Sequence, residues 1–229
     1  MPFPDLADRV TEVHDRIAAA VARGGHGQRV TLIAVTKTYG PDAVLSAWES
    51  GITDVGENRV QEALTKMGEV TVPVRWHLIG HLQRNKAKVV DRFEMVHSVD
   101  SNRLADAVTR VGEERGSPIR CLMQVNVSGE DTKGGLSPVE ADSEGERWLR
   151  LRGLRVEGVM TMAPLDADER TLRATFGAAR RVKERLVALG HPAAELSMGM
   201  SNDYEIAVEE GATMVRLGTV LFGARDTHE

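Results

Sequence analysis

Lys37 is the residue whose type and position most directly predict chemistry in this chain. It lies near the end of the run Thr31 to Thr38, which is typical of a buried strand, and Tyr39-Gly40-Pro41 then predicts a turn. A lysine amine at the mouth of a strand can be partly desolvated, which lowers its pKa and allows the neutral amine to form a Schiff base with an aldehyde. Taken alone, such a lysine is more often a solvated residue that closes a strand, so this hypothesis depends on the rest of the sequence.

Two glycine-containing segments near the C-terminus predict an anion site. Gly199 to Ser201 precedes a helix expected to open at Asn202, and Gly218-Thr219 precedes a short final helix. Glycine lets the backbone approach a ligand, hydroxyls donate hydrogen bonds, and amides at helix starts favour anions, so phosphate is the expected guest. The alternative is two ordinary turns in which Ser201 or Asn202 caps the helix, and Asn202 with Glu205 resembles a capping box. Because Asp203 could repel an anion, we assign the donors to Ser201, Gly218 and Thr219.

The elements that must position these groups alternate regularly between strand-like and helix-like segments. An amphipathic helix that ends at Gly24-Gly25 comes first and is expected to cover the fold. Strands are predicted at residues 31–36, 53–56, 74–80, 95–99, 119–127, 156–160, 195–198 and 213–217. Helices are predicted at residues 43–49, 60–67, 82–90, 103–114, 139–151, 172–189, 204–209 and 220–224. Eight β-α units at this length predict an α/β fold, a closed (β/α)8 TIM barrel. We expect residues 129–145 to form a long loop.

The carboxyl ends of the predicted strands carry polar groups that would ring one mouth of the barrel. Asn58 follows the second strand, His77 lies in the third, and Arg216 lies in the eighth. Each has an ordinary explanation: Asn58 could cap a helix, His77 could be a hydrogen-bonded core histidine, and Arg216 could pair with a carboxylate. Ligands of such barrels bind at this mouth, and phosphate often binds after strands seven and eight. Together with Lys37, the pattern predicts a ligand with an aldehyde at one end and a phosphate at the other, which pyridoxal 5′-phosphate (PLP) fits.

Composition restricts the class of protein. The chain has 229 residues and a formal net charge of −5, which disfavours a general nucleic-acid surface, and we expect residues 1–229 to form a single domain. Cys121 is the only cysteine and is assigned to the core, in agreement with a reducing compartment. The N-terminal residues lack the apolar stretch of a signal peptide or membrane anchor, so we expect a cytoplasmic protein. We assign no metal site.

Five motifs resemble the pyridoxal phosphate homeostasis protein family, whose members are single-domain relatives of the alanine racemase N-terminal barrel with fold type III PLP binding. They extend over nearly the whole chain in the family's order: Ala34 to Lys37, Gly56 to Glu62, Trp76 to Lys86, Leu196 to Asp203 and Val215 to Gly223. The resemblance implies that Lys37 forms the internal aldimine with PLP. It also implies that Ser201, Gly218 and Thr219 hold the phosphate and that Arg216 approaches the pyridine nitrogen.

We also count Asn58, His77 and Met198 as cofactor-binding residues. Arg59 departs from the family, whose members often carry tyrosine there, and this leaves the cofactor assignment intact while changing the rim of the pocket.

Function depends on whether bound PLP is used for catalysis. Carbanion chemistry gains most when a carboxylate protonates the pyridine nitrogen, and the Arg216 guanidinium cannot accept that proton. The racemases of related fold use a second acid/base residue from an added domain, for which this chain has no residues, so we assign no catalytic residue. We therefore expect a monomeric protein that binds, buffers and delivers PLP through a Lys37 Schiff base, with apo-PLP enzymes as recipients and small amino acids or amines as further ligands. The alternatives are a PLP-dependent amino-acid racemase and, more remotely, a Schiff-base aldolase acting on a phosphorylated sugar.

Overall fold

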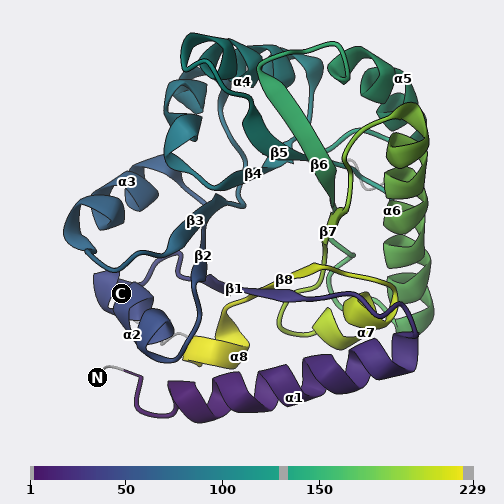
Figure 1. The fold of residues 1–229 in the computed structure, drawn as a ribbon. Helices are drawn as coiled ribbons and strands as arrows, with labels where there is room; N and C mark the ends of the chain where they lie inside the picture. The colour runs from purple at the N-terminus through teal and green to yellow at the C-terminus, as the bar shows by residue number, and fades with distance from the viewer. Residues whose placement is uncertain (1–2, 129–133, 224–229) are drawn as a thin grey trace.

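The chain forms a closed barrel of eight parallel strands, as the sequence predicts (Figure 1). The structure is a computed structural model and describes residues 3–128 and 134–223. Neighbouring strands in the chain are neighbours in the barrel, and β1 closes it by pairing with β8. The strands are β1 (Thr31–Val35), β2 (Asp54–Glu57), β3 (Arg75–Leu78), β4 (Met95–Val99), β5 (Ile119–Gln124), β6 (Leu154–Met160), β7 (Glu195–Ser197) and β8 (Met214–Leu217).

Helical segments surround the strands and alternate with them along the chain (Figure 1). They are α1 (Leu6–Gly24), α2 (Pro41–Glu49), α3 (Val60–Glu69), η1 (Arg84–Arg92), α4 (Asn102–Glu114), α5 (Pro138–Trp148), α6 (Glu169–Leu189), α7 (Tyr204–Glu209) and α8 (Thr219–Phe222). The N-terminal helix packs along α7 and α8, outside β1 and β8, which confirms its covering role. Its buried face comprises Leu6, Val10, Val13, Ile17 and Ala20.

Three local predictions differ from the structure. The segment predicted as a helix at 82–90 is the 3-10 helix η1, in which Ala87 and Val90 are the buried residues; a three-residue turn aligns side chains at this spacing. The helix predicted at 139–151 is α5, so the expected loop at 129–145 is wrong from Pro138 onward, where a capping box of Ser137 and Glu140 starts the helix. The fifth strand ends at Gln124 rather than at 127, although Val125 continues the backbone pairing with Leu136. Residues 129–133 and Ala224 lie outside the described residues.

The barrel has two separate apolar regions. The larger one lies between the strands and the surrounding helices, and it includes Trp148 and Phe176. The smaller one, inside the barrel, consists of Ile33, Met95, Leu122, Met160 and Met214 with Met162 packed against it. Because the inner group is small, much of the barrel interior is available to buried polar side chains.

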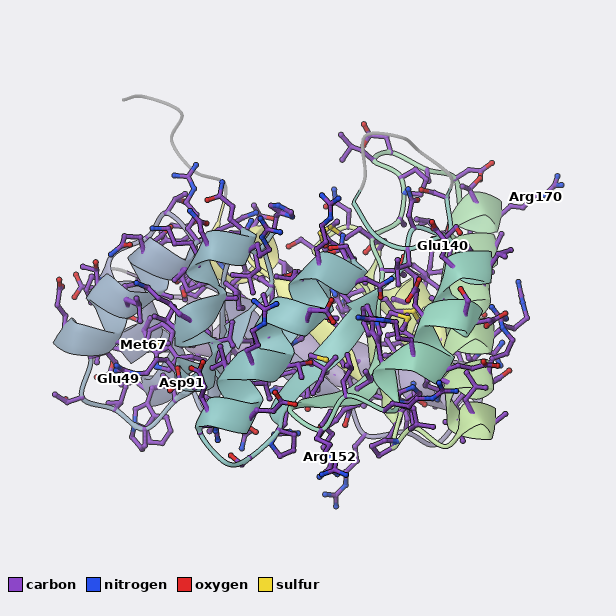
Figure 2. All side chains as sticks on the ribbon, turned by 90° about the horizontal axis from the view of Figure 1, so that it is seen from above. Glu49, Met67, Asp91, Glu140, Arg152 and Arg170 are labelled. Atoms are coloured by element: carbon purple, nitrogen blue, oxygen red, sulfur yellow. The ribbon has the colours of Figure 1, made fainter. Side chains whose placement is uncertain are left out.

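The two ends of the barrel can be told apart in Figure 2 from the labelled residues. Glu140 and Arg170, in the first turns of α5 and α6, lie toward the upper edge. Glu49 and Met67, near the ends of α2 and α3, lie toward the lower edge together with Arg152. Each strand runs toward the start of the next helix, so the carboxyl ends of the strands face the upper edge. Within the described parts of the chain, no helix is both long and apolar enough to cross a membrane.

Candidate functional site

A cavity of about 1000 Å³ lies at the carboxyl ends of the strands. Six of the eight residues predicted to bind the cofactor line it, namely Lys37, Asn58, Ser201, Arg216, Gly218 and Thr219. The other two, His77 and Met198, are not among its lining residues: His77 is 2% exposed and makes hydrogen bonds inside the barrel, and Met198 is fully buried in the outer apolar region. The structure therefore brings together the amine, the guanidinium and the glycine and hydroxyl groups that the sequence singled out.

Lys37 occupies a tight turn directly after β1. The Tyr39 amide donates to the Thr36 carbonyl at 3.1 Å, and Thr38 has φ of 68°, the left-handed third position that a type II turn requires. A β-branched residue is strained in this conformation, and such strain persists only where surrounding contacts fix the backbone. One such contact is the hydrogen bond of 2.5 Å from the Thr38 amide to Glu62 Oε1. The backbone on both sides of Lys37 is thus held by side chains from elsewhere in the chain.

A buried ion cluster under this turn supplies those contacts. Lys66 Nζ lies 2.7 Å from Glu57 Oε1, 2.8 Å from Glu62 Oε1 and 2.7 Å from the Thr36 carbonyl oxygen. The Thr36 hydroxyl also donates to Glu57 Oε1, at 2.6 Å. Burial raises the pKa of Glu57, against the hydrogen bonds from Lys66 and Thr36, which lower it. The cluster joins β2 and α3 to the turn that carries Lys37.

The loops after β7 and β8 lie side by side on the cavity wall, and the loop after β8 is next to the end of β1, because these two strands pair. Ser201 Oγ lies 3.4 Å from the backbone nitrogens of both Gly218 and Val220. Gly199 has φ of 95°, and a Cβ there would lie 2.7 Å from Ala207 Cβ, so only glycine fits this bend. The amides of Gly218 and Val220 and the hydroxyls of Ser201 and Thr219 therefore form a cluster of hydrogen-bond donors. An anionic group in the cavity could bind to this cluster.

The alternative in which Asn202 caps the helix after β7 is not observed. Asp203 occupies the N-cap position of α7 without capping it, and its Oδ1 accepts a hydrogen bond of 2.6 Å from the Met200 amide. Burial raises the pKa of Asp203, while the Met200 amide and Arg216 oppose that rise. Asp203 thus shapes the loop after β7, and the donors of the anion cluster come from the neighbouring residues.

Arg216 lies at the inner end of the cavity and is 5% exposed. Its Nη1 donates to Ser197 Oγ at 2.5 Å, and its Nη2 donates to the Thr161 carbonyl at 3.0 Å. Burial lowers the pKa of the guanidinium to about 10, and Asp203 partly opposes this shift. Arg216 is therefore a positively charged donor at neutral pH, held in a fixed orientation.

The cavity also has lining residues that the sequence did not assign to the cofactor. Tyr39, His81 and Asp100 also line the cavity, and His81 Nδ1 lies 3.3 Å from Asp100 Oδ2. His81 lies inside the motif Trp76 to Lys86, shortly after the third strand, and Asp100 follows the fourth strand. Their positions after strand ends were the sequence signal that could have placed them at the cavity. Lys66 gave no signal, because a lysine in a helix is usually solvated.

Comparison with known proteins places the chain in a family. The model for the alanine racemase N-terminal domain matches residues 13–226. The chain belongs to that family. A Pseudomonas aeruginosa protein named pyridoxal phosphate homeostasis protein is 41% identical over 227 residues, which cover 96% of each chain. An Aquifex aeolicus protein of the same name is 38% identical over 229 residues, which cover 96% of this chain and 99% of the relative.

Solved structures agree with this assignment. PipY of Synechococcus elongatus, solved with PLP bound, superposes with a TM-score of 0.85 at 35% identity, over 95% of this chain and all of PipY. An alanine racemase from Clostridium difficile superposes with a TM-score of 0.73 at 14% identity, over 93% of this chain and 58% of the racemase, and this likeness shows the barrel fold alone. The resemblance read from the five motifs and the barrel prediction are both confirmed.

Proposed function

We propose that this protein binds PLP reversibly through Lys37 and takes part in PLP homeostasis by holding and delivering the cofactor without substantial turnover. The observation that carries the proposal is the presence of Lys37, Arg216 and the Ser201–Gly218–Thr219 donors on the wall of one cavity. The relatives named for pyridoxal phosphate homeostasis, at 38–41% identity over nearly the whole chain, support it independently.

The residues present fit this cofactor. Lys37 offers a primary amine for the aldehyde. The Gly218 and Val220 amides both donate to Ser201 Oγ at 3.4 Å, so a phosphate bound beside that hydroxyl would have these three groups as donors. The cavity volume lies at the upper end of the range of roughly 300–1,000 Å³ that is typical of pockets for drug-sized ligands. When bound, the cofactor supplies an aldehyde that condenses with primary amines and an aromatic ring that can accept electrons.

Arg216 supports binding rather than turnover. The guanidinium has donors only, so it can hold the ring nitrogen by a hydrogen bond but cannot accept its proton. A positive charge there disfavours a second positive charge on the ring, which weakens the ring as an electron acceptor. Tyr39, His81 and Asp100 also line the cavity and carry groups that can exchange a proton, so the proposal includes a direct measurement of turnover.

The proposal has further parts that concern the whole protein. We take residues 1–229 to form one PLP-binding domain that acts as a monomer in the cytoplasm. Apo-PLP enzymes are the proposed recipients, and small amines or amino acids are proposed to compete with Lys37 for the aldehyde.

Binding is tested by loading the purified protein with PLP, reducing it with borohydride and mapping the added mass by peptide mass spectrometry. We expect a visible absorption band that reduction removes, and a single adduct on Lys37. The Lys37→Ala variant should keep its fold and lose the adduct, while Lys86→Ala, which changes an exposed lysine of η1, should keep it. An adduct on Lys86 in the unaltered protein would refute the assignment of Lys37.

Delivery and turnover are tested on the loaded protein. We expect it to restore the activity of an apo-PLP enzyme and to leave the α-protons of amino acids in deuterated solvent essentially unexchanged. Exchange that depends on Lys37 at an enzymatic rate of about 1–10³ per second would replace the carrier with a racemase-like enzyme.

A further inference from the structure

A row of buried polar side chains crosses the barrel interior behind Arg216. Arg216 Nη1 donates to Ser197 Oγ at 2.5 Å, and Ser197 Oγ lies 2.8 Å from His97 Nδ1. His97 Nε2 lies 2.9 Å from His77 Nδ1, and His77 Nε2 lies 2.9 Å from Asp54 Oδ1. We call these five residues the interior relay. All five are at most 5% exposed.

The interior relay joins strands that are distant around the barrel. It passes from β8 to the adjacent β7, then to β4 three strands away, and then through β3 to β2. The His97–Ser197 bond therefore crosses the interior. One end, Arg216, lines the cavity at the carboxyl ends of the strands, while the other, Asp54, is the first residue of β2 and does not line it.

The chemistry of the two ends fixes the direction of every hydrogen in the row. Arg216 can only donate, and an ionised Asp54 can only accept. Between them, a neutral histidine or a serine donates one hydrogen and accepts another. The only arrangement without two opposed hydrogens or two opposed lone pairs has Ser197 donating to His97 Nδ1, His97 Nε2 donating to His77 Nδ1, and His77 Nε2 donating to Asp54. With both rings neutral, each histidine therefore carries its proton on Nε2.

The charges around the row agree with this arrangement. Asp54 also accepts from Arg75, whose Nε and Nη2 lie 2.8 and 2.5 Å from its oxygens. Although burial raises the pKa of Asp54, the hydrogen bonds from His77 and Arg75 hold it well below its ordinary value, so the carboxylate is ionised. Burial lowers the pKa of His97 well below its ordinary value, and the charge of Arg216 acts in the same direction, so a proton on this ring is strongly disfavoured.

We propose that the interior relay is a positioning device that orients Arg216 toward the cavity and directs every transferable hydrogen away from it, toward Asp54. Its members are positioning residues, since Arg216 alone reaches the cavity. Because the guanidinium is cationic and can only donate, a ring nitrogen that faces it must be an unprotonated acceptor, and the relay holds Arg216 in the orientation that requires this. The consequence for the cofactor rests on the proposed function, whereas the arrangement of hydrogens is a property of the protein alone.

The arrangement is tested by long-range proton–nitrogen NMR of protein labelled with ¹⁵N-histidine and free of cofactor. The chain has 7 histidines, and His77→Gln and His97→Gln variants assign the two signals of interest. We expect both rings to be neutral Nε2–H tautomers at pH 7 and His97 not to titrate between pH 8 and pH 6. An Nδ1–H tautomer or a protonated ring at pH 7, at either position, overturns the proposal whether or not the protein binds PLP.

The connection to Arg216 is tested with Ser197→Ala, with Ser46→Ala as the matched control. Ser46 is 3% exposed in α2, away from the relay. We expect Ser197→Ala to shift the His97 Nδ1 resonance in the unloaded protein, to shift the absorption band of the loaded protein, and to weaken PLP binding about two- to tenfold, as expected for loss of one hydrogen bond.

Ser46→Ala should change none of these three measurements. If Ser197→Ala lowers stability but leaves the His97 resonance and the absorption band unchanged, Ser197 is only a packing residue and the proposal fails. Absence of PLP binding in the unaltered protein would instead overturn the proposed function, while the tautomers would still decide the arrangement of hydrogens.

Discussion

Replacing Lys66 by methionine is expected to destabilise the protein severely. The Lys66 side chain is 5% exposed and that of Glu57 is fully buried, and the ammonium is within 2.8 Å of two carboxylate oxygens and a carbonyl. Glu57 Oε2 is buried and has no hydrogen-bond partner among the described residues. The hydrogen bonds from Lys66 and Thr36 to Oε1 therefore offset the cost of burying this carboxylate. Removing one partner of a buried pair destabilises by about 3–5 kcal/mol. For a chain of this size, each kcal/mol lowers the Tm by roughly 2–4 °C, so the expected loss is about 6–20 °C.

Urea and thermal denaturation of the cofactor-free protein at pH 7 measure this effect. Lys86→Met, at an exposed position in η1, is the control and should change stability by no more than about 0.5 kcal/mol. Adding Glu57→Gln to Lys66→Met removes the uncompensated charge and should recover about 0.5–3 kcal/mol. Because the cluster holds the turn around Lys37, the single variant should also form less of the covalent adduct with PLP.

The pH dependence of Lys66→Met gives an independent check. Burial raises the pKa of Glu57 above its unfolded value, and loss of Lys66 removes an interaction that lowers it. Between the unfolded and folded pKa values the folded state binds more protons, so the free energy of unfolding falls as pH rises through that window. The stability deficit of Lys66→Met should therefore shrink as the pH is lowered from 7 to 5. A deficit below about 1 kcal/mol, or one that does not change with pH, would refute the reasoning.

Three further outcomes are expected. Ser201→Ala and Thr219→Val should each weaken PLP binding roughly ten- to hundredfold, by loss of a hydrogen bond to a dianion, and equal losses for pyridoxal would contradict a phosphate role. Because the pKa of His97 is depressed, the unfolded state takes up a proton first, so stability should fall as pH drops below about 6.5, by at most about 1.4 kcal/mol per pH unit, and urea titrations of His97→Leu should lack that slope. Ser137→Ala should lower the free energy of unfolding by about 0.5–2 kcal/mol through loss of the α5 cap and leave PLP affinity unchanged.

The barrel was predictable because its signals are local. Each strand is a short β-type run, each helix has its own apolar spacing, and regular alternation leaves few ways to connect them. The exceptions depend on finer detail. In η1 the burial of Ala87 and Val90 fits a three-residue turn, which the polar residues around them did not indicate. The helix at 139–151 was predicted together with an overlapping loop at 129–145, and the capping box of Ser137 and Glu140 decides in favour of the helix.

The candidate site was predictable where a residue's position in the chain fixes its place in the fold. Lys37 follows β1 and Arg216 lies on β8, and the carboxyl ends of these strands converge, so the approach of both residues to one cavity follows from the barrel itself. His77 was expected at the cofactor, but its side chain contacts His97. This contact depends on strand register: His77 pairs with Met95, and side chains alternate along β4, so His97 points to the same side as Met95. Lys66 reaches Glu57 across the start of α3, and no spacing rule distinguishes it from a solvated lysine.

The small apolar group inside the barrel has a consequence for protein engineering. Three of its five buried members are methionines, whose flexible side chains tolerate substitution. The interior relay beside it contains ionised groups. Replacing buried polar or ionic sets by well-packed apolar side chains of similar volume is often neutral or stabilising, by about 1–4 kcal/mol. Selection for heat resistance alone should therefore convert this interior to leucine, isoleucine and phenylalanine. The resulting thermostable barrels would still fold with Lys37 in place. Their Arg216 would no longer be oriented by the interior relay, and this loss would appear only in the absorption spectrum of the bound cofactor.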